Sequence, residues 1–365
     1  MFSHYCLPHA GGIETVVDAL VRRLAARHRV TLVSSAWHGR EGVTREGALT
    51  TWRLPAVHAS ERYGVPYPVP TGGLVTSALA EAGEAQVLHA HGALYAQTIL
   101  ARRLAARAGR PLVLTEHVGW VPYRGAVLRA VQGAAWRIVG DATLRGASAV
   151  VALNGRVGDW LAARVPSCVP RLIPNGVELD RFTPPTPAQR AQSRSVLGLP
   201  ADGVLGLFVG RDSPKKRRED VVAAEREGWT LVLAGAPVRI HHHGIIDLGV
   251  LAPESMTLLY HACDFLVHAA EGEGFPMAVQ EAMATGLPVA LRWDTGYAAT
   301  LDRAVVDAND DIALTLRHAD ALAADAALRA TSGRRARDWA STQWSWEVTV
   351  AAYEAVYAQC LHGAT

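Results

Sequence analysis

Short runs of β-branched and aliphatic residues alternate along this chain with longer stretches in which apolar residues recur every three or four positions. Such alternation predicts strands of parallel sheets joined by amphipathic helices. Five predicted strands lie in the first half, at 28–35, 85–92, 111–117, 149–154 and 170–176. Five more lie in the second half, at 204–210, 229–235, 245–249, 263–270 and 287–293. The pattern therefore predicts an α/β protein with two mostly parallel sheets.

Two helices are predicted with particular clarity. The first runs from Ile13 to Ala26 and begins directly after Gly11 and Gly12. Its apolar face consists of Ile13, Val16, Val17, Leu20, Val21 and Leu24. The second is a terminal amphipathic helix within 345–361, whose roughly aligned positions are Trp346, Val350, Tyr353 and Tyr357. Both helices are expected to bury one face against a sheet.

The stretch between the two series of strands contains Pro184, Pro185 and Pro187, which cannot continue a helix or a central strand. It is interpreted as a connection between domains, and a length of 365 residues suits two cores. The predicted organisation is a first domain at 1–178, a linker at 179–199, a second domain at 200–340 and a terminal helix at 341–365.

Composition excludes several classes of protein. Hydrophobic residues make up 50% of the chain and charged residues 19%, which is typical of a soluble globular protein. No run approaches the roughly 18 apolar residues of a membrane span, and the start lacks the pattern of an export signal. The four cysteines show no CxxC spacing. The predicted location is the cytoplasm.

The charge is unevenly distributed. Residues 1–175 carry 19 Arg against 10 acidic residues, whereas residues 176–365 carry 17 basic against 24 acidic residues. A basic half suits a phosphorylated ligand, and since signatures of nucleic-acid binding are missing, no nucleic-acid partner is expected. The arginines of 100–110 could settle on an anionic membrane, but this contact is not favoured. Arg137, Asp141 and Arg145 recur every four residues, as on a solvated, ion-paired helix face.

Three groups of residues lie where ligands gather in parallel α/β sheets, at the carboxyl ends of strands and the first turns of helices. Gly11 and Gly12 open the first helix, where glycines allow backbone to approach a phosphate or sugar closely. A tight strand-to-helix turn explains them about equally well. They do not form the GxGxxG fingerprint of a dinucleotide site, which disfavours an oxidoreductase.

The second group is FVGRDSPKKR, in which a predicted strand ends at Gly210 and is followed by Arg211 and Lys216. A guanidinium and an ammonium at a strand end suit a diphosphate, although a solvated basic turn is the simpler interpretation. Lys215 and Lys216 are the only lysines among 36 basic residues.

The third group is EGEGFPMAVQEAMATG, residues 271–286, where Pro276 marks the start and Gly286 the end of a short helix. Glu273 stands just before this helix and Glu281 one and a half turns into it. Two carboxylates there can accept the hydroxyl groups of a ribose and a sugar. Alternatively, Glu273 merely complements the helix dipole and Glu281 is a solvated residue.

Taken together, these motifs resemble family 4 of the retaining glycosyltransferases over nearly the whole chain. The motifs are LPHAGGIE, HAHG, TEH, LIPNGVELDRF, VGR with Lys216, and EGFPMAVQEAMATGLPVA. The resemblance implies the GT-B architecture of two facing Rossmann-like domains, with a terminal helix crossing back to the first. It also implies retaining transfer of a sugar from a UDP- or GDP-sugar to a hydroxyl of a lipid, saccharide or natural product, with the donor as co-substrate and no cofactor.

The resemblance further implies which residues act. The first domain would face the acceptor and the second would bind the nucleotide sugar. The implied catalytic residues are His117, near the reacting sugar, Arg211 and Lys216, on the donor diphosphate, and Glu273, on the donor sugar. The remaining implied donor contacts are Gly11, Gly12, Gly274, Phe275, Pro276, Met277 and Glu281, of which Glu281 would hold the ribose.

The chain departs from the family pattern at four places. It begins near the end of the family's first strand, and Arg217 replaces the usual Gly after the Lys. Only 18 residues separate Lys216 from Gly235, which predicts a compact donor domain, and Thr295-Gly296-Tyr297 replaces a Gly-Gly. No metal is expected, because no Asp-x-Asp pair is present. His89 and His91 are interpreted as packing residues or substrate contacts, and the histidines at 241–243 as a solvated turn. Two alternatives stay open, a sugar-nucleotide epimerase and a non-enzymatic sugar-binding protein.

Overall fold

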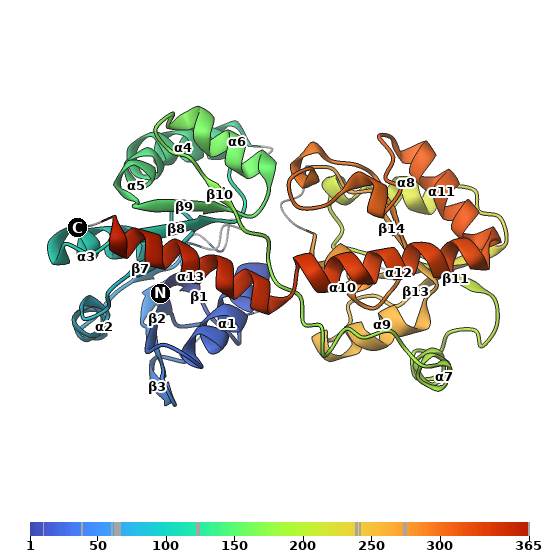
Figure 1. Cartoon of the computed structure of the whole chain (residues 1–365), viewed down its shortest axis with the longest axis horizontal. Coiled ribbons are helices and arrows are strands. Elements are labelled where there is room, and N and C mark those ends of the chain that lie inside the picture. Colours follow the sequence, from blue (N-terminus) through green and yellow to red (C-terminus); the bar gives the residue numbers. More distant parts are fainter. Residues whose placement is uncertain are drawn as a thin grey trace. The chain divides into compact units, whose positions relative to one another are not determined.

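The computed structural model describes residues 1–9, 11–37, 39–59, 61, 67–121, 125–237, 240, 242–272 and 276–363. The chain divides into two compact units. Met1–Pro174 and Thr349–Thr365 form the first, and Asn175–Val348 form the second (Figure 1). The chain therefore leaves the first unit, builds the second from one continuous segment, and returns.

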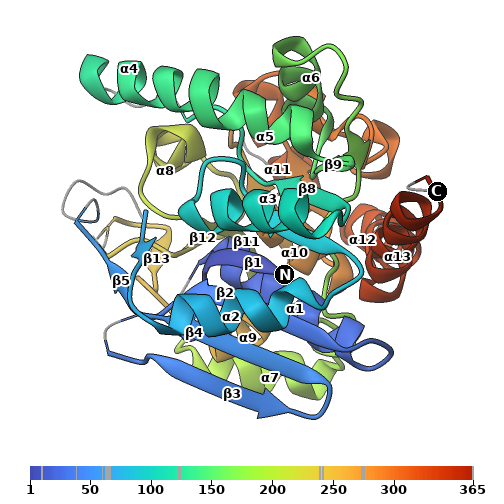
Figure 2. The same cartoon turned by 90° about the vertical axis from the view of Figure 1, so that its left-hand side faces the viewer.

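The first unit is built on an eight-stranded sheet, seen in Figure 2, with the order β10-β9-β8-β7-β1-β2-β4-β3. All neighbours pair in parallel except β3 and β4. The strands are β1 (Phe2–Tyr5), β2 (Val30–Ser35), β3 (Gly42–Glu46), β4 (Leu49–Leu54), β7 (Leu88–His91), β8 (Leu112–Glu116), β9 (Ala149–Ala152) and β10 (Arg171–Leu172). A separate pair, β5 (Ala56–Val57) and β6 (Val69–Pro70), is antiparallel.

The first unit's helices follow from the predicted periodicity. They are α1 (Gly12–Ala25), α2 (Leu74–Gly83), α3 (Ala96–Ala108), α4 (Ala126–Ala135), a π-helical turn η2 (Trp136–Gly140), α5 (Asp141–Gly146), α6 (Gly155–Arg164) and the terminal α13 (Trp346–His362). The apolar face predicted for α1 is buried at Val16, Val17, Leu20, Val21 and Leu24. The predicted strand at 170–176 shortens to β10, because only two of its residues pair with β9.

The last helix packs on the first unit through polar contacts as well as apolar ones. Val350 and Tyr353 of α13 are buried. The Tyr353 hydroxyl lies 3.1 Å from Thr115 Oγ1 at the end of β8, and the Tyr357 hydroxyl lies 2.8 Å from His89 Nδ1 in β7. Burial raises the pKa of Tyr353 to about 12, so this hydroxyl stays neutral and can donate a hydrogen bond.

The second unit is built on a five-stranded parallel sheet with the order β13-β12-β11-β14-β15. Its strands are β11 (Val204–Val209), β12 (Trp229–Ala234), β13 (Ile245–Asp247), β14 (Phe265–His268) and β15 (Val289–Leu291). Its α-helices are α7 (Pro187–Val196), α8 (Arg218–Ala223), α9 (Met256–Ala262), α10 (Met277–Ala284), α11 (Ile312–Ala324) and α12 (Ala326–Gln343), and its 3₁₀ turns are η3 (Pro214–Lys216), η4 (Pro253–Ser255), η5 (Thr295–Tyr297) and η6 (Arg303–Val305).

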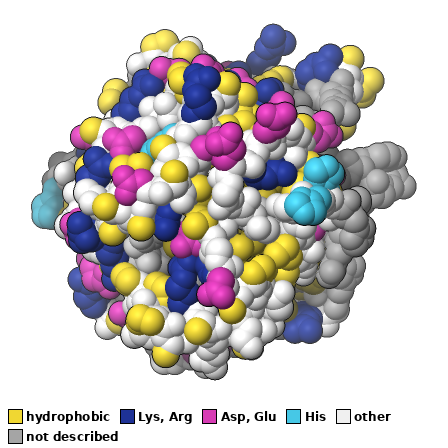
Figure 3. All heavy atoms as spheres, turned by 90° about the vertical axis from the view of Figure 1, so that its right-hand side faces the viewer, with side chains coloured by type: hydrophobic (Ala, Val, Ile, Leu, Met, Phe, Trp, Pro, Cys, Tyr) yellow, Lys and Arg dark blue, Asp and Glu magenta, His cyan; other side chains and the backbone are white. Residues whose placement is uncertain are grey.

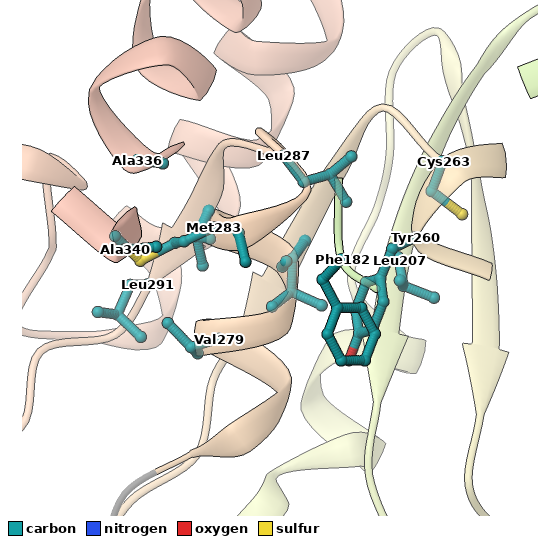
Figure 4. Packing of buried hydrophobic residues seen from close by; sticks show 14 of the residues in the cluster. Phe182, Leu207, Tyr260, Cys263, Val279, Met283, Leu287, Leu291, Ala336 and Ala340 are labelled. Carbon is teal, nitrogen blue, oxygen red and sulfur yellow. The ribbon is translucent and has the colours of Figure 1, made fainter. Parts of the chain in front are cut away.

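The core of the second unit fixes the position of α10. Met283 and Val279 of this helix point into a buried cluster with Leu291 of β15 and Ala340 of α12, as Figure 4 shows. Full burial of side chains of this size stabilises the fold by about 1.5 to 3 kcal/mol each. The predicted short helix is confirmed, and Gly286 ends it with a φ of 72°, where glycine is preferred.

Two regions differ from the sequence predictions. The segment interpreted as a connection between domains contains α7, which Pro187 opens at a position where its missing N–H is not needed. Thr186 and Gln189 close a capping box there. The antiparallel hairpin of β3 and β4 was not predicted, because only the turn at Gly47, with a φ of 57°, marks it.

Candidate active site

Two glycines shape the carboxyl ends of β11 and β12. A Cβ on Gly235, whose φ is 103°, would lie 2.9 Å from the carbonyl oxygen of Gly210. A Cβ on Gly210 would lie 3.2 Å from Cδ of Lys216. The end of β12 can therefore lie this close to Gly210 only without a side chain at position 235, and the aliphatic part of the Lys216 side chain lies against Gly210.

Arg211 and Lys216 follow directly from this strand end. Arg211 is exposed and Lys216 is partly exposed, so both charges are accessible to a ligand. Lys216 ends the 3₁₀ turn η3, in which its N–H donates to the carbonyl of Ser213. The next residue, Arg217, is the N-cap of α8. Its φ of 56° lies in the left-handed region, which glycine adopts most easily. The backbone geometry that glycine favours is thus adopted by an arginine.

The loops after three strands are tied together at this edge of the sheet. The Glu271 N–H donates to the carbonyl of Lys215 at 2.9 Å, which joins the loop after β14 to that after β11. Asp294, which follows β15 and is buried, accepts the Gly272 N–H at 2.9 Å and the Gly296 N–H at 2.8 Å. The segments carrying Lys216 and leading into α10 therefore lie side by side.

The first turn of α10 meets this edge. Pro276 precedes the helix and is buried, and Met277 is its first residue and partly exposed. No side chain among the described residues caps the helix, so its first N–H groups carry a partial positive charge. Glu273, Gly274 and Phe275, which the sequence assigns to the donor sugar, lie outside the described residues.

Glu281 lies in the middle of α10, and its carboxyl is largely shielded from water. Burial raises the pKa of Glu281 to about 7, although the Tyr260 hydroxyl donates to Oε2 at 2.7 Å and Arg181 contributes positive charge. Tyr260 is itself fully buried in α9. The interpretation of Glu281 as a solvated residue is therefore wrong. Among the described residues, no cation forms an ion pair with Glu281, and a partly buried carboxyl of this kind is suited to accepting hydroxyl groups of a ligand.

In the first unit, Gly11 and Gly12 behave differently. A Cβ on Gly11 would clash with Glu14 Oε2, whereas a Cβ on Gly12 would meet no atom of the described residues within 4 Å. Glu14 folds back over the start of α1, where Oε1 lies 2.6 Å from His9 Nδ1 and 3.3 Å from His4 Nε2. Position 11 must be glycine, because a larger side chain would occupy the place of the Glu14 carboxylate. The space beside Gly12 holds no atom of the described residues.

His117, at the end of β8, belongs to a row of buried histidines. Its Nε2 lies 3.0 Å from His91 Nδ1, and burial lowers the pKa of His117 to about 4. His91 Nε2 has no hydrogen-bond partner among the described residues, although His91 is fully buried. Both nitrogens of His89 are bonded, one to Thr115 and one to Tyr357, which agrees with a packing role. His117 is therefore neutral near pH 7.

Three polar residues of the site escaped the sequence predictions. Tyr260, Asp294 and Glu14 hold site residues in place, yet each is an ordinary residue of its segment. Only Asp294 carried a local signal, because an Asp two residues before a Gly often forms an Asx turn. His242 and His243 are exposed, as expected of a solvated turn. His241 lies outside the described residues.

No helix in the part of the chain that the structure describes is long and apolar enough to span a membrane. Within the same residues, no three His, Cys, Asp or Glu side chains are grouped so that they could hold a metal ion.

Comparison with known proteins places these features in a family. The model described as Glycosyltransferase Family 4 matches residues 10–181, and the model described as Glycosyl transferases group 1 matches residues 207–328. The chain belongs to the family 4 glycosyltransferases. The first match covers the buried histidines, and the second covers Arg211, Lys216 and α10.

Two curated relatives of this family 4 glycosyltransferase have names that include an inositol derivative. The D-inositol 3-phosphate glycosyltransferase of Xylanimonas cellulosilytica is 32% identical over 256 residues, 61% of this chain and 60% of the relative. A GDP-mannose-dependent α-(1-6)-phosphatidylinositol monomannoside mannosyltransferase of Mycolicibacterium smegmatis is 26% identical over 93% of this chain and 92% of the relative. The chain thus spans 60% of the first relative's length and nearly all of the second's.

Solved structures show the fold of this glycosyltransferase. Anabaena HepE in complex with UDP has a TM-score of 0.75 at 17% identity, with 98% of each chain covered. Sucrose-phosphate synthase from Thermosynechococcus elongatus has a TM-score of 0.75 at 22% identity, covering 100% of this chain and 98% of that one. These neighbours have the GT-B fold, which confirms the predicted fold class.

Proposed function

We propose that this chain transfers a sugar from a nucleoside diphosphate sugar to a hydroxyl group of a saccharide, polyol or lipid, with retention of the anomeric configuration. One observation carries this proposal. The hydrogen bond from the Glu271 N–H to the Lys215 carbonyl brings the cationic segment after β11 beside the segment that leads into α10. Positive charge and free helix N–H groups then lie at one edge of a parallel sheet, as a nucleoside diphosphate requires, and the Glu281 carboxyl would extend this site from further along α10.

The charges support the chemistry of transfer. When the bond between the anomeric carbon and the diphosphate oxygen breaks, negative charge develops on the diphosphate. Arg211 and Lys216 would stabilise that charge more in the transition state than in the ground state. The acceptor oxygen would form the new bond from the same face, and its proton would pass to the departing diphosphate oxygen. No protein nucleophile is needed for this route.

Other residues would complete the site. Glu281 would accept the ribose hydroxyls, and Glu273 with the backbone of residues 274–277 would hold the donor sugar. His117 would act as a neutral hydrogen-bonding group, because burial keeps the pKa of this residue well below the working pH. The relatives named for inositol derivatives favour a polyol or glycolipid as the acceptor. The name of one relative includes GDP-mannose and HepE was solved with UDP, so GDP- and UDP-sugars are the donors to test first.

We further propose that transfer needs no divalent metal. The charge that a metal would neutralise is met by Arg211, Lys216 and the first turn of α10, and the sequence lacks an Asp-x-Asp pair. Activity should therefore survive excess EDTA. Activity that disappears with EDTA and returns with Mn²⁺ or Mg²⁺ would contradict this part of the proposal.

The test of the main proposal compares two adjacent lysines. Lys216→Ala should reduce kcat/KM for sugar transfer about 100-fold or more, the scale expected when one charge-stabilising group is removed. Lys215→Ala is the matched control, since Lys215 is exposed and contributes its backbone carbonyl, which alanine retains. Before the kinetic assays, calorimetry with UDP- and GDP-sugars identifies which donor the wild type binds. Equal losses in both variants, or binding of free sugar in preference to nucleotide, would refute the proposed function.

A further inference from the structure

Arg218 and Asp247 form an ion pair in the interior of the second unit. The Arg218 guanidinium donates to Asp247 Oδ2 at 2.5 Å, and the two side chains are only 7% and 1% exposed. On the face of the molecule shown in Figure 3, by contrast, acidic and basic side chains are interspersed at the surface, where water weakens their attraction. Burying two charges costs free energy that an apolar pair would not cost, so stability is a weak explanation of this pair.

Asp247, the last residue of β13, is a point at which three segments meet. Its Oδ2 also accepts the Ile240 N–H at 2.9 Å, from the loop after β12, and its Oδ1 accepts the Gly249 N–H at 2.9 Å. Arg218 is the first residue of α8. One carboxylate therefore holds together the start of α8, the loop after β12 and the turn after β13.

These contacts continue along the edge of the sheet and end at Lys216. The Gly249 carbonyl accepts the Gly235 N–H at 2.8 Å, and Gly235 lies against the Gly210 carbonyl. The aliphatic part of the Lys216 side chain lies against Gly210 in turn. Lys216 also stands two residues before Arg218 in the chain. The same set of contacts therefore constrains Lys216 twice, through its side chain and through its backbone.

The helix that follows Lys216 is too short to fix this arrangement by itself. α8 has six residues, and a helix of this length is not stable on its own in water. Its buried residues are Arg218 and Val221. The ion pair is therefore one of two buried anchors that hold the start of α8, and with it the turn that carries Lys216.

We propose that the Arg218–Asp247 pair positions Lys216 for the donor diphosphate, an inference that rests on the proposed glycosyl transfer. Asp247 holds Arg218, and Arg218 fixes the start of α8. The position of that start determines where the Lys216 ammonium meets the diphosphate. Because a displacement of about 1 Å is costly in catalysis, both residues affect the reaction without contacting the substrate.

The first measurement is hydrogen exchange of the full chain without ligand. Arg218→Met replaces the guanidinium by an unbranched apolar side chain and leaves the Asp247 carboxylate without its cation. The amides of residues 216–222 should exchange at least about tenfold faster than in the wild type, because their segment loses an anchor. The amides of β11 and β14 should stay as protected as in the wild type.

The second measurement is the affinity for UDP and GDP, determined by calorimetry. Arg218→Met should weaken binding of the nucleotide that the wild type prefers by about tenfold, the scale of one lost hydrogen bond to a charged group. Lys216→Ala should weaken it by at least as much. In the Lys216→Ala background, Arg218→Met should add less than about a twofold loss, because it acts through Lys216. A residue that only stabilises the fold would act independently, so the two losses would multiply.

Two variants serve as controls. Arg218→Lys keeps a positive charge beside Asp247 and should stay within about threefold of the wild-type affinity. Arg217 pairs with Asp220 at 2.7 Å with side chains that are 38% and 43% exposed, so Asp220→Asn removes an exposed ion pair at the same helix. It should change neither exchange nor affinity. Circular dichroism verifies folding, and Arg218→Gln, which can still donate to Asp247, replaces Arg218→Met if the latter does not fold.

Three outcomes would overturn the proposal. The first is a folded Arg218→Met variant with the wild-type affinity for UDP and GDP. The second is a double variant in which the losses of Arg218→Met and Lys216→Ala multiply. The third is an equal loss in Asp220→Asn. All three leave the proposed glycosyl transfer standing, whereas a wild type that binds neither UDP nor GDP would refute the proposed function and this inference with it.

Discussion

Glu281 shows how one residue combines a structural cost with a binding role. Its carboxyl is shielded by the packing of α10 and α9, and the Tyr260 hydroxyl is its hydrogen-bond donor in the structure. Burial disfavours the charged form of a carboxyl, which is why its pKa rises to about 7. The ribose of a nucleotide would donate two hydroxyl hydrogen bonds and so favour the carboxylate. The Glu281 carboxyl is therefore expected to lose its proton when the donor binds.

This residue predicts a pH dependence of donor binding. Below pH 7 the free protein holds Glu281 protonated, so the affinity for UDP-glucose or GDP-mannose should fall by about tenfold between pH 8 and pH 6. These diesters do not titrate in that range, so calorimetry at both pH values reports the protein. Glu281→Gln should bind more weakly at pH 8 and show little of this pH dependence. A wild-type affinity that is constant from pH 6 to pH 8 would contradict the assignment.

Glu281→Gln, which should weaken donor binding, should increase the free energy of unfolding at high pH. A pKa that is higher in the folded than in the unfolded state means that the folded protein binds the extra proton, so stability is lost as pH rises from about 4.5 to 7. Glu281→Gln keeps an acceptor for Tyr260 and never ionises. It should match the wild type at pH 5 and exceed it at pH 8 by about 1 to 3 kcal/mol, measured by denaturant unfolding.

At the scale of elements, two loops are held together by Asp294. Its two carboxylate oxygens accept the Gly272 N–H and the Gly296 N–H, which joins the loop after β14 to the turn after β15. Arg292 adds an ion pair with Glu271 at 2.9 Å. The loop leading to the proposed donor-sugar residues is thus positioned by a segment that departs from the family pattern.

Asp294→Ala is therefore expected to reduce kcat/KM for the nucleotide sugar by about 10- to 100-fold, because a small displacement of a positioning loop is costly in catalysis. It should leave the affinity for the nucleotide without its sugar within a few-fold of the wild type. The matched control is Asp302→Ala, since Asp302 also caps a 3₁₀ turn but has no bond to the loop at 271–272. Equal kinetic losses in the two variants would show a general effect on folding.

The sequence predicted elements better than it predicted contacts. Alternating patterns located the parallel strands, and Pro276 with Gly286 located α10, because these signals are local. The partners Tyr260 and Asp294 come from other elements, and no local pattern shows that two distant segments will meet. Position 217 illustrates the difference well. Its departure from the usual Gly is visible in the sequence, but only the structure shows that an arginine adopts the left-handed backbone there.

At the scale of the whole molecule, the two units are assembled from the chain in different ways. The second unit is continuous, and two buried clusters of its described residues lie between Val177 and Trp344. The first unit needs the returning segment, because Tyr353 and Tyr357 bond to Thr115 and His89. Without α13, these two strand-end side chains would lose partners in a buried region, which costs about 1 to 3 kcal/mol for each unsatisfied group.

The isolated second unit, residues 175–348, should therefore fold cooperatively and bind the nucleotide sugar within about tenfold of the full chain, since Arg211, Lys216 and Glu281 all lie within it. It should show no transfer. Residues 1–174 alone should melt at a much lower temperature than the same segment supplied with a peptide of residues 349–365, which contains most of α13. Differential scanning calorimetry and nucleotide titration of the three samples measure both effects. If the isolated second unit folds but does not bind nucleotide, then the first unit supplies an indispensable donor contact, and the open space beside Gly12 becomes the place to look for it.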